Sequence, residues 1–418
     1  MKTIKNYDVK IFTDNLEEGA IRQLERLLSV EVFSDKKIRI MPDVHSGAGC
    51  VIGFTGNLGD KVIPNIVGVD IGCGMRVVRL GRIGDIDFHK FHTHIMEHVP
   101  SGMKVREAKY NYKPLVGEEM DIYREAKAML TDLKCYRNMK NMDRIHKAVG
   151  TLGGGNHFIE LNTDAERCVY LVIHTGSRNL GKQVAEYYQE KAVGHLTEGF
   201  DTLEEDISRI IEEYKATGRR KEIQRTIMQM RKAFDTANPS IDRELCYLEG
   251  QMREDYLHDM RICQRWAQLN RRLIALLLVK FFDGAEVEEE FESIHNYISD
   301  DNMIRKGAIS AAEGERCIIP LNMRDGSLIC TGLGNADWNN SAPHGAGRVM
   351  SRSEAYKVVT ISEFEDSMRG IYSECVNDFT RDESPMVYKP AQEIIDNISD
   401  TVKITKHIKP IFNFKATK

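Results

Sequence analysis

The run PNIVGVDIGCGMRVVRL at residues 64–80 places glycines on both sides of one carboxylate, Asp70, and one thiol, Cys73. Glycine has no side chain, so these positions let the backbone bend sharply and leave room for other groups to approach it. The apolar residues at either end predict that the run is anchored in a buried core. A fold for this chain must therefore hold Asp70 and Cys73 together in a tight, closely packed turn.

The chain is long enough to bury a large core. Its 418 residues are 42% hydrophobic and 29% charged, which indicates a globular protein of one large domain or two to three smaller ones. The longest apolar run, LIALLLVKFF at 273–282, is broken by Lys280 and is shorter than the roughly 20 residues that a membrane span needs. The opening residues MKTIKNYDVK lack the apolar segment of a signal peptide. We therefore expect a cytoplasmic protein with no membrane partner.

Neither the cysteines nor the overall charge identifies a partner. Nine cysteines are scattered without CxxC pairs, which favours reduced thiols over a disulfide framework. The formal net charge of −5 gives no overall attraction to nucleic acid. A local basic strip near the C-terminus is a candidate RNA contact, and it comprises Lys403, Lys406, Lys409, Lys415 and Lys418.

Short β-rich runs alternate with glycine turns in the first 80 residues, and KKIRIMPDV at 36–44 and MRVVRL at 75–80 are expected to be strands. Residues 168–193, CVYLVIHTGSRNLGKQVAEYYQEKAV, predict a buried strand, a glycine-containing turn and an amphipathic helix. In that arrangement, backbone amides and a helix N-terminus can hold an anion. The pattern is therefore evidence for a phosphate site.

Helical patterns dominate the middle of the chain. Residues 103–149 are charged and weakly periodic, and we expect helices there. The stretch from about 200 to 283 has few glycines and long helical periodicity, which predicts a mainly helical insertion. One face of its last helix is expected to carry Tyr256, Met260, Ala267 and Leu273. After residue 296 the pattern returns to short strands, notably GERCIIPLNM and SLICTGLGN.

Six segments combine small residues with side chains that bind metals or phosphate. Cysteine and several histidines with one carboxylate suit Mn, Zn or Fe better than Mg, which prefers oxygen ligands. A thiolate can bridge two metal ions, and the glycines beside Cys73 would let cations and a phosphate approach the backbone closely. The segments are PDVHSGAG (42–49), GVDIGCGM (68–75), GTLGGGNHFIEL (150–161), VIHTGSRNLG (172–181), IHNYIS (294–299) and APHGAGRVMSR (342–352).

Each motif also has an ordinary structural interpretation when it is taken alone. Asp70 and Cys73 could be a turn-forming Asp and a buried thiol, and His174 could be a hydrogen-bonded core histidine. Arg178 could make a surface ion pair, whereas the Gly-Ala-Gly bend after His344 is a credible anion pocket. Four clustered histidines lack glycine neighbours and are expected to be solvated or structural: His89, His92, His94 and His98.

Taken together and in this order, the six segments resemble the motifs of the RtcB family of RNA-splicing ligases, from about residue 40 to the C-terminus. The resemblance implies an α/β (α+β) fold of the RtcB type, with mixed sheets carrying glycine-rich active-site loops. It implies one catalytic domain over residues 1–418 that includes the helical insertion at about 200–283. It further implies GTP-dependent ligation of RNA 2′,3′-cyclic phosphate or 3′-phosphate ends to 5′-hydroxyl ends, in tRNA splicing or RNA repair.

The resemblance assigns a two-manganese centre to five matching positions. Cys73 would bridge the two Mn²⁺ ions, Asp70 and His157 would complete one site, and His174 and His295 would complete the other.

The resemblance also assigns the nucleotide chemistry. His344 would be the nucleophile that takes GMP from GTP, Asp43 would orient a metal ligand or accept a proton, and Arg178 would contact RNA or nucleotide phosphate. Lys415 is expected to contact guanine, with Lys418 as a competitor for that role. The full set of expected nucleotide contacts is Asn156, His344, Gly345, Ala346, Gly347, Arg348 and Lys415.

One loop departs from the family pattern. Many relatives have Gly-Ser-Met-Gly after IIP, whereas this chain has LNMRDGS at 321–327, with Arg324 in place of a small residue beside the expected nucleotide pocket. This change leaves nucleotide preference open, and the resemblance also leaves open whether an archease-type activator is needed. Two alternatives compete with a ligase: a metal-dependent phosphoesterase that acts on cyclic-phosphate RNA ends without joining them, and an RNA-end-binding protein with a structural metal.

Overall fold

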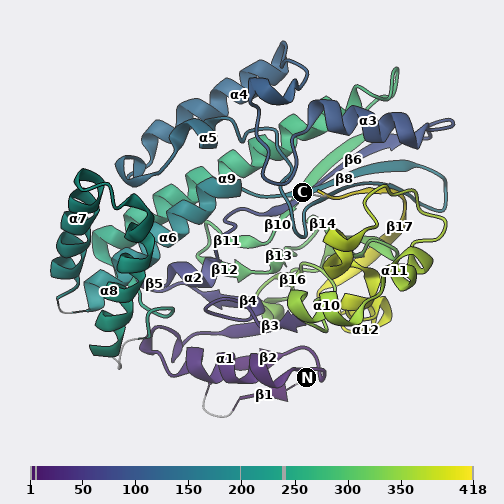
Figure 1. Cartoon of the computed structure of the whole chain (residues 1–418). Helices are drawn as coiled ribbons and strands as arrows, with labels where there is room; N and C mark the ends of the chain where they lie inside the picture. The colour runs from purple at the N-terminus through teal and green to yellow at the C-terminus, as the bar shows by residue number, and fades with distance from the viewer. Residues whose placement is uncertain (1, 5–6, 198, 238–241, 417–418) are drawn as a thin grey trace.

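The computed structural model describes residues 2–4, 7–197, 199–237 and 242–416. Two large sheets and two small ones are combined with helices, as the sequence predicts for an α+β protein (Figure 1). The runs expected to be strands at 36–44, 75–80 and 314–335 form strands, and residues 168–193 form a strand followed by a helix.

The larger sheet has seven strands and is antiparallel throughout. Its interior strand β8 is buried at every position, in agreement with its apolar sequence VYLVIHT. In spatial order the strands are β10 (Glu289–Ile294), β6 (Gly74–Gly81), β8 (Val169–Thr175), β7 (Phe158–Thr163), β17 (Val402–Phe414), β15 (Gly326–Gly332) and β14 (Arg316–Asn322).

The second large sheet has six strands, and only its β2–β3 pairing is parallel. In spatial order the strands are β1 (Lys2–Thr3), β2 (Val9–Ile11), β3 (Ile38–His45), β4 (Ile52–Asn57), β12 (Met303–Lys306) and β11 (Asn296–Ile298). Two small sheets pair β13 (Ala308–Ser310) with β16 (Ser341–Pro343), and β5 (Lys61–Val62) with β9 (Leu248–Glu249). The chain passes from one large sheet to the other at His295, between β10 and β11.

The helices surround the sheets. In chain order the α-helices are α1 (Glu18–Leu28), α2 (Pro64–Val67), α3 (Phe88–His98), α4 (Glu118–Ala128), α5 (Met142–His146), α6 (Arg178–Leu196), α7 (Phe200–Ala216), α8 (Ile223–Ala237), α9 (Gly250–Val279), α10 (Arg352–Val358), α11 (Ile361–Ser367) and α12 (Ala391–Asp396). Short 3₁₀ turns connect several of them, among them residues 108–110, 129–132 and 378–383. No described helix is long and apolar enough to cross a membrane.

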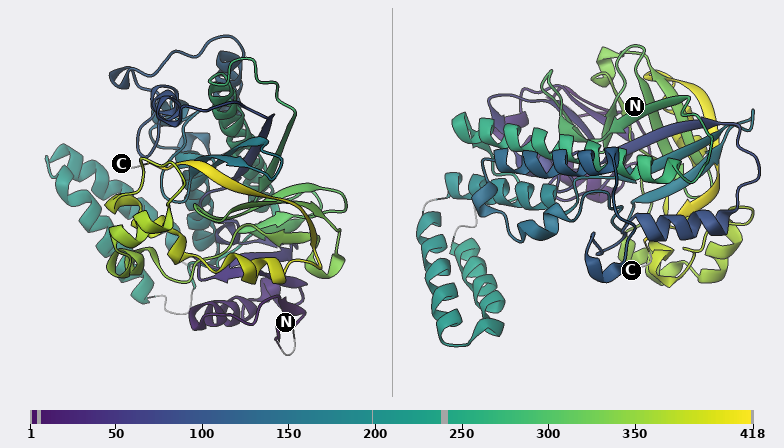
Figure 2. Two further views of the ribbon diagram at one scale, coloured as in Figure 1. Left: turned by 90° about the vertical axis from the view of Figure 1, so that its right-hand side faces the viewer. Right: turned by 90° about the horizontal axis from the view of Figure 1, so that it is seen from above.

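The helical stretch at about 200–283 consists of two different structures. Helices α7 and α8 form a hairpin that projects from the body of the protein (Figure 2). Helix α9 instead packs against β6 and β8 of the seven-stranded sheet, and its expected apolar face is fully buried. Within this stretch α7 and α8 thus project at the surface, whereas α9 belongs to the core.

Candidate active site

Strand pairing brings residues from distant segments to one end of the seven-stranded sheet. Cys73 directly precedes β6, His157 directly precedes β7, and His174 is the penultimate residue of β8. Because β8 runs antiparallel to both neighbours, its end lies beside their beginnings, and Met75 and Phe158 both pair with His174. Ile294 of β10 pairs with Gly74, which brings His295 to the same place.

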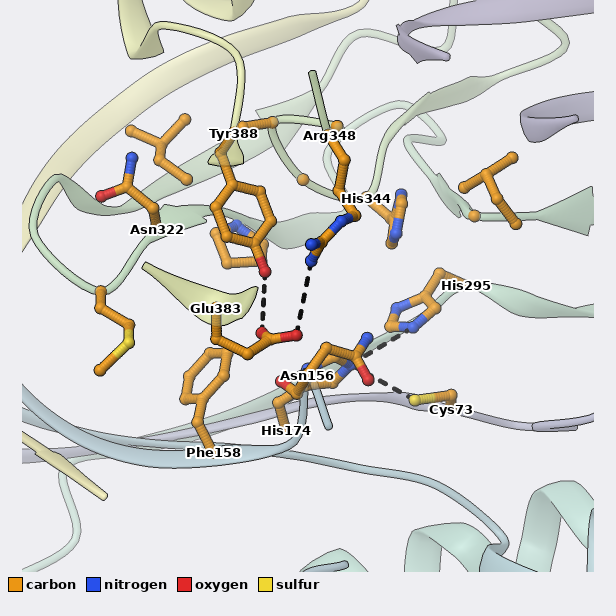
Figure 3. Close-up of a pocket in the computed structure, with 18 of the residues that line it drawn as sticks. Cys73, Asn156, Phe158, His174, His295, Asn322, His344, Arg348, Glu383 and Tyr388 are labelled. Carbon is orange, nitrogen blue, oxygen red and sulfur yellow. Dashed lines mark hydrogen bonds and ion pairs between the residues drawn. The ribbon is translucent and has the colours of Figure 1, made fainter. Parts of the chain in front are cut away.

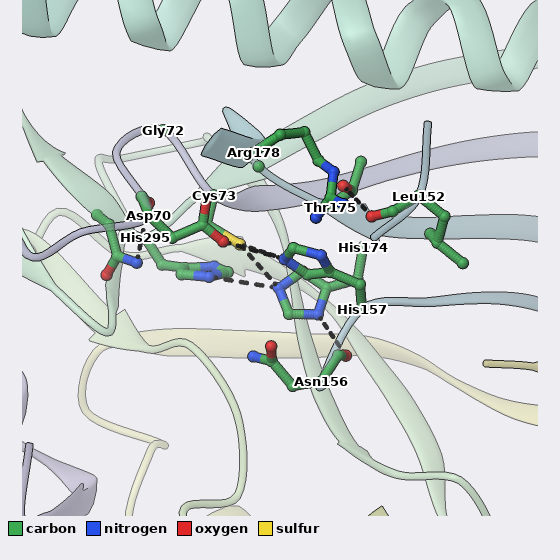
Figure 4. A network of polar contacts seen from close by, with 12 residues as sticks. Asp70, Gly72, Cys73, Leu152, Asn156, His157, His174, Thr175, Arg178 and His295 are labelled. Carbon is green, nitrogen blue, oxygen red and sulfur yellow. Dashed lines mark hydrogen bonds and ion pairs between the residues drawn. The ribbon is translucent and has the colours of Figure 1, made fainter. Parts of the chain in front are cut away.

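The ligand atoms of this cluster face one another (Figure 4). Cys73 Sγ lies 3.3 Å from His174 Nε2 and 3.6 Å from His157 Nε2. His157 Nε2 is 3.0 Å from Asp70 Oδ2, and His174 Nε2 is 3.4 Å from His295 Nε2. The atoms form two groups that share the thiol: Cys73 with His174 and His295, and Cys73 with Asp70 and His157.

The glycines of the run at 64–80 are explained by the close packing of the cluster. Gly72 has φ +71°, and a Cβ there would lie 2.8 Å from the backbone Cα of Gln264 in α9. A Cβ on Gly74 would lie 2.6 Å from the carbonyl oxygen of Ser293. A side chain at either position would push the turn away from its neighbours and displace Asp70 and Cys73.

Burial sets the protonation of the ligands. It lowers the pKa of His174 and of His295 well below the usual value, which keeps both imidazoles in the neutral form that binds metals. His174 Nδ1 lies 3.1 Å from the carbonyl oxygen of Asn156, so it donates a hydrogen bond there and leaves the Nε2 lone pair facing the cluster. Burial and the charge of Asp70 raise the pKa of the Cys73 thiol well above its usual value, so a thiolate here needs nearby positive charge.

The residues present fit a transition-metal centre. A thiol and three imidazoles are soft and borderline donors, and with one carboxylate oxygen they form a mixed donor set that suits such ions. Burial alone would raise the pKa of Asp70, but the contact with His157 lowers it overall and keeps the carboxylate charged. The buried Oδ1 of Asp70 has no hydrogen-bond partner among the described residues, so it is available as a ligand atom.

A second histidine site adjoins the cluster. His344, just after β16, places its Nδ1 2.6 Å from Asp43 Oδ2, and the same oxygen accepts the backbone N–H of His344 at 3.1 Å and of Gly345 at 3.2 Å. The ring centroids of His344 and His295 are 4.8 Å apart. Gly347 has φ +75°, and a Cβ there would lie 2.2 Å from the backbone oxygen of Asp43. The glycine-rich bend thus brings the backbone against Asp43.

One cavity of about 330 Å³ joins the two sites. Figure 3 shows Cys73, His174 and His295 on one side of it and Tyr388 and Glu383 on the other. Eleven residues expected in the site line this cavity: Asp70, Cys73, Asn156, His174, His295, His344, Gly345, Ala346, Gly347, Arg348 and Lys415.

Three expected residues lie just outside the lining. Asp43 stands behind His344, and His157 contacts Asp70 and Cys73. Arg178 has φ +60° and uses its guanidinium to bind Gly102 O at 2.9 Å and Thr151 Oγ1 at 3.3 Å. The expected phosphate contact of Arg178 therefore competes with two internal hydrogen bonds.

Two acidic residues that line the cavity, Glu383 and Glu160, were not predicted from the sequence. Glu383 binds Lys415 Nζ at 3.0 Å and the hydroxyl of Tyr388 at 2.8 Å, and Arg352 lies 2.5 Å away. Burial by itself would raise the pKa of Glu383, but the charges of Lys415 and Arg352 lower it to about 2. Glu383 lies in the run RDESPMVYK, where no glycine or histidine marks it.

Glu160 is the other missed acid. Hydrogen bonds join it to Asn162 Nδ2 at 3.2 Å and to Asn413 Nδ2 at 2.6 Å. Burial raises the pKa of Glu160 to about 7, against the opposing effect of these bonds. The sequence pattern FIELN of β7 could have identified Glu160, because Phe158 and Glu160 are two residues apart and therefore lie on the same face of the strand.

The remaining sequence predictions concern Arg324, the basic strip near the C-terminus and the clustered histidines. Arg324 is half exposed and pairs with Asp325, while its neighbours Asn322 and Met323 line the cavity. Lys406 pairs with Asp164 at 2.7 Å, and Lys418 lies outside the described residues. The four clustered histidines belong to α3 and make structural contacts with other elements or within the helix, such as His94 Nε2 with the carbonyl oxygen of Leu277 in α9 at 2.9 Å.

Comparison with known proteins identifies the family. The family model described as tRNA-splicing ligase RtcB matches residues 23–416. The chain is 30% identical over 444 residues to the RNA-splicing ligase RtcB of Escherichia coli, covering 99% of this chain and 98% of that protein. It is 24% identical over 474 residues to the tRNA-splicing ligase RtcB of Archaeoglobus fulgidus, covering 95% and 91%. The chain, with its Cys73-centred ligand cluster and its histidine after β16, belongs to the RtcB family.

Proposed function

We propose that this protein is an RNA ligase that joins 2′,3′-cyclic phosphate or 3′-phosphate ends to 5′-hydroxyl ends, with GTP as the co-substrate. The names of its relatives support RNA ligation. The observation that carries the mechanism is the position of His344, which is held by Asp43 and faces the metal-ligand cluster across one cavity.

The proposed metal is manganese, at two adjoining positions. Asp70, Cys73 and His157 would hold one ion, and Cys73, His174 and His295 would hold the other. Bound there, two cations would neutralise phosphate charge and polarise the phosphorus that is attacked.

His344 is suited to be the nucleophile. Its Nδ1 donates to Asp43, so the Nε2 lone pair is free to attack the α-phosphorus of GTP. A nitrogen–phosphorus bond forms, the bond to the β-phosphate oxygen breaks, and pyrophosphate leaves. Asp43 stabilises the positive charge that develops on the imidazole. A phosphoesterase would need neither this pair nor a nucleotide.

The later steps use the same cavity. Water first opens a cyclic phosphate to a 3′-phosphate. An oxygen of that phosphate then displaces His344 from the GMP phosphorus, which leaves the RNA end activated by GMP. Finally the 5′-hydroxyl attacks the activated 3′-phosphorus, GMP leaves, and the phosphodiester forms. Arg348 and Asn156 line the cavity and would hold phosphate oxygens during these steps.

Glu160 and Lys415 suit the recognition of guanine. An ionised carboxylate accepts hydrogen bonds from the adjacent N1–H and N2–H groups of guanine, which adenine does not offer as a pair. Lys415 Nζ lies 5.5 Å from the centre of the Phe158 ring and can donate to the guanine carbonyl oxygen. We propose that this end of the cavity binds the base. In this account Arg324, which pairs with Asp325 on the loop 321–327, makes no base contact.

Two further proposals concern the cellular location of the protein and an activating partner. All nine cysteines are free thiols, which supports a reducing, cytoplasmic location. An archease-type protein is proposed as an activator, and its effect would appear as a faster turnover of the ligase.

The function is tested with two RNA strands, one ending in a 2′,3′-cyclic phosphate and one beginning with a 5′-hydroxyl, incubated with the protein, Mn²⁺ and GTP. We expect a joined product that requires GTP. Conversion of the cyclic end to a 3′-phosphate without joining would establish the phosphoesterase instead. No chemical change in either RNA would indicate an RNA-end-binding protein.

A further inference from the structure

Two adjacent buried side chains of α9, Asn270 and Arg271, contact the backbone around the candidate metal ligands. Both are completely buried, although neither lines the cavity. Arg271 is a charged group with 0% exposure, and placing such a group in a core is costly unless its hydrogen bonds are made. The groups that Arg271 contacts therefore indicate its role.

Arg271 joins three ligand-bearing segments. Its Nη1 donates to the carbonyl oxygen of Gly72 at 2.8 Å and to that of Thr175 at 2.9 Å. These carbonyls belong to the residues next to Cys73 and His174. Its Nη2 binds Glu292 Oε2 at 3.1 Å. Glu292 lies on β10, which leads directly to His295.

Asn270 connects the segment that carries the remaining histidine, His157, to the same helix. Its Oδ1 accepts the backbone N–H of Gly150 at 2.8 Å and of Thr151 at 3.0 Å. Its Nδ2 donates to Thr151 O at 3.1 Å and to Gly176 O at 3.3 Å. The loop from Gly150 leads to His157, and Gly176 lies two residues after His174.

We propose that Asn270 and Arg271 are positioning residues that hold the five candidate metal ligands in a binding-competent arrangement. Each segment arrives from a different part of the chain, and the two side chains connect all of them to one rigid helix. Removing an outer hydrogen-bond partner of metal ligands typically lowers metal affinity 10- to 100-fold. This inference rests on the metal centre proposed above.

The test compares R271M with R272M, in which the neighbouring arginine is changed. Arg272 is 45% exposed and pairs with Glu118 on the surface. Metal-free proteins are first compared by circular dichroism and thermal unfolding, and Mn²⁺ and Co²⁺ are then titrated by calorimetry and by the thiolate-to-cobalt absorption band. We expect wild type and R272M to bind equally, and R271M to bind at least about 10-fold more weakly with a diminished band.

Each outcome separates the positioning role from the metal centre itself. A folded R271M with wild-type affinity and absorption band would overturn the positioning role. Failure of the wild type to bind either ion would instead overturn the proposed metal centre. If R271M does not fold, R271K decides: its single ammonium cannot reproduce all three contacts, so affinity must fall at least about 3-fold, and unchanged affinity contradicts the inference.

Discussion

The Nδ1 atom of His344 lies 2.6 Å from Oδ2 of Asp43, which is completely buried. This pair fixes the imidazole orientation and leaves Nε2 facing the cavity. The arrangement joins the six-stranded sheet, which carries Asp43 on β3, to the loop after β16. His344 is thereby oriented before any nucleotide arrives.

Replacing Asp43 with asparagine should slow nucleotide attack. The amide oxygen can still accept the N–H groups that Oδ2 binds, but it lacks the negative charge that stabilises the positive charge developing on the imidazole. We expect the D43N variant to form the GMP adduct at least about 100-fold more slowly than wild type, with Mn²⁺ binding unchanged. Rapid-quench labelling with GTP measures the rate. Labelling at the wild-type rate would show that the charge of Asp43 does not assist the attack.

Replacing Cys73 with serine should disrupt both proposed metal positions, because the thiol belongs to both ligand groups. We expect C73S to retain fewer than two Mn²⁺ ions per chain after dialysis, as measured by metal analysis. Cys168 is a matched control, because it is also a buried free thiol but lies outside the cluster. Retention of two ions by C73S, or an equal loss in C168S, would argue against a bridging thiolate.

Guanine binding should depend on pH through Glu160. Burial raises the pKa of Glu160 to about 7, so the carboxyl group is protonated below that pH and loses an acceptor. We expect the affinity for GMP to rise with pH through about 7 and to be roughly 10-fold weaker at pH 6 than at pH 8. Calorimetry should show no such dependence for E160Q. A wild-type profile that is flat over this range would exclude Glu160 from base recognition.

Glu383 should contribute to stability in a pH-dependent way. Its pKa is lowered from the usual value of 4.5 to about 2 in the folded protein, so its contribution is present above pH 4.5 and is lost as the pH falls towards 2. We expect E383Q to lower the free energy of unfolding at pH 7 by about 3 kcal/mol, because Lys415, Arg348 and Arg352 lose their shared carboxylate. Urea denaturation measures this loss, with the exposed Glu374 replaced in E374Q as the control. Equal stabilities of E383Q and wild type at pH 7 would contradict the assignment.

The spatial clustering of the candidate metal ligands was predictable because residues of this chemistry stand beside glycines in the sequence. Glycines are needed beside these ligands because the backbone must bend closely around them. A Cβ on Gly72, for example, would clash with α9. Strand patterns also predicted β3, β6 and β8, because their runs are apolar and bounded by turns.

Other residues around the site cannot be recognised from the sequence pattern. Glu383, Asn270 and Arg271 are ordinary polar residues in sequence, and only tertiary contacts give them a role. Helical periodicity likewise could not separate the projecting hairpin of α7 and α8 from the buried α9, because amphipathic helices share one repeat wherever they pack.

The most direct test of the account is covalent labelling with GTP that carries a radioactive α-phosphate. Purified wild type and H344A are incubated with Mn²⁺ and labelled GTP, and each is analysed on a denaturing gel. We predict an acid-labile label on wild type, release of pyrophosphate, and neither on H344A. An unlabelled wild type that is folded and metal-loaded, or an equally labelled H344A, would contradict the central claim that His344 carries GMP.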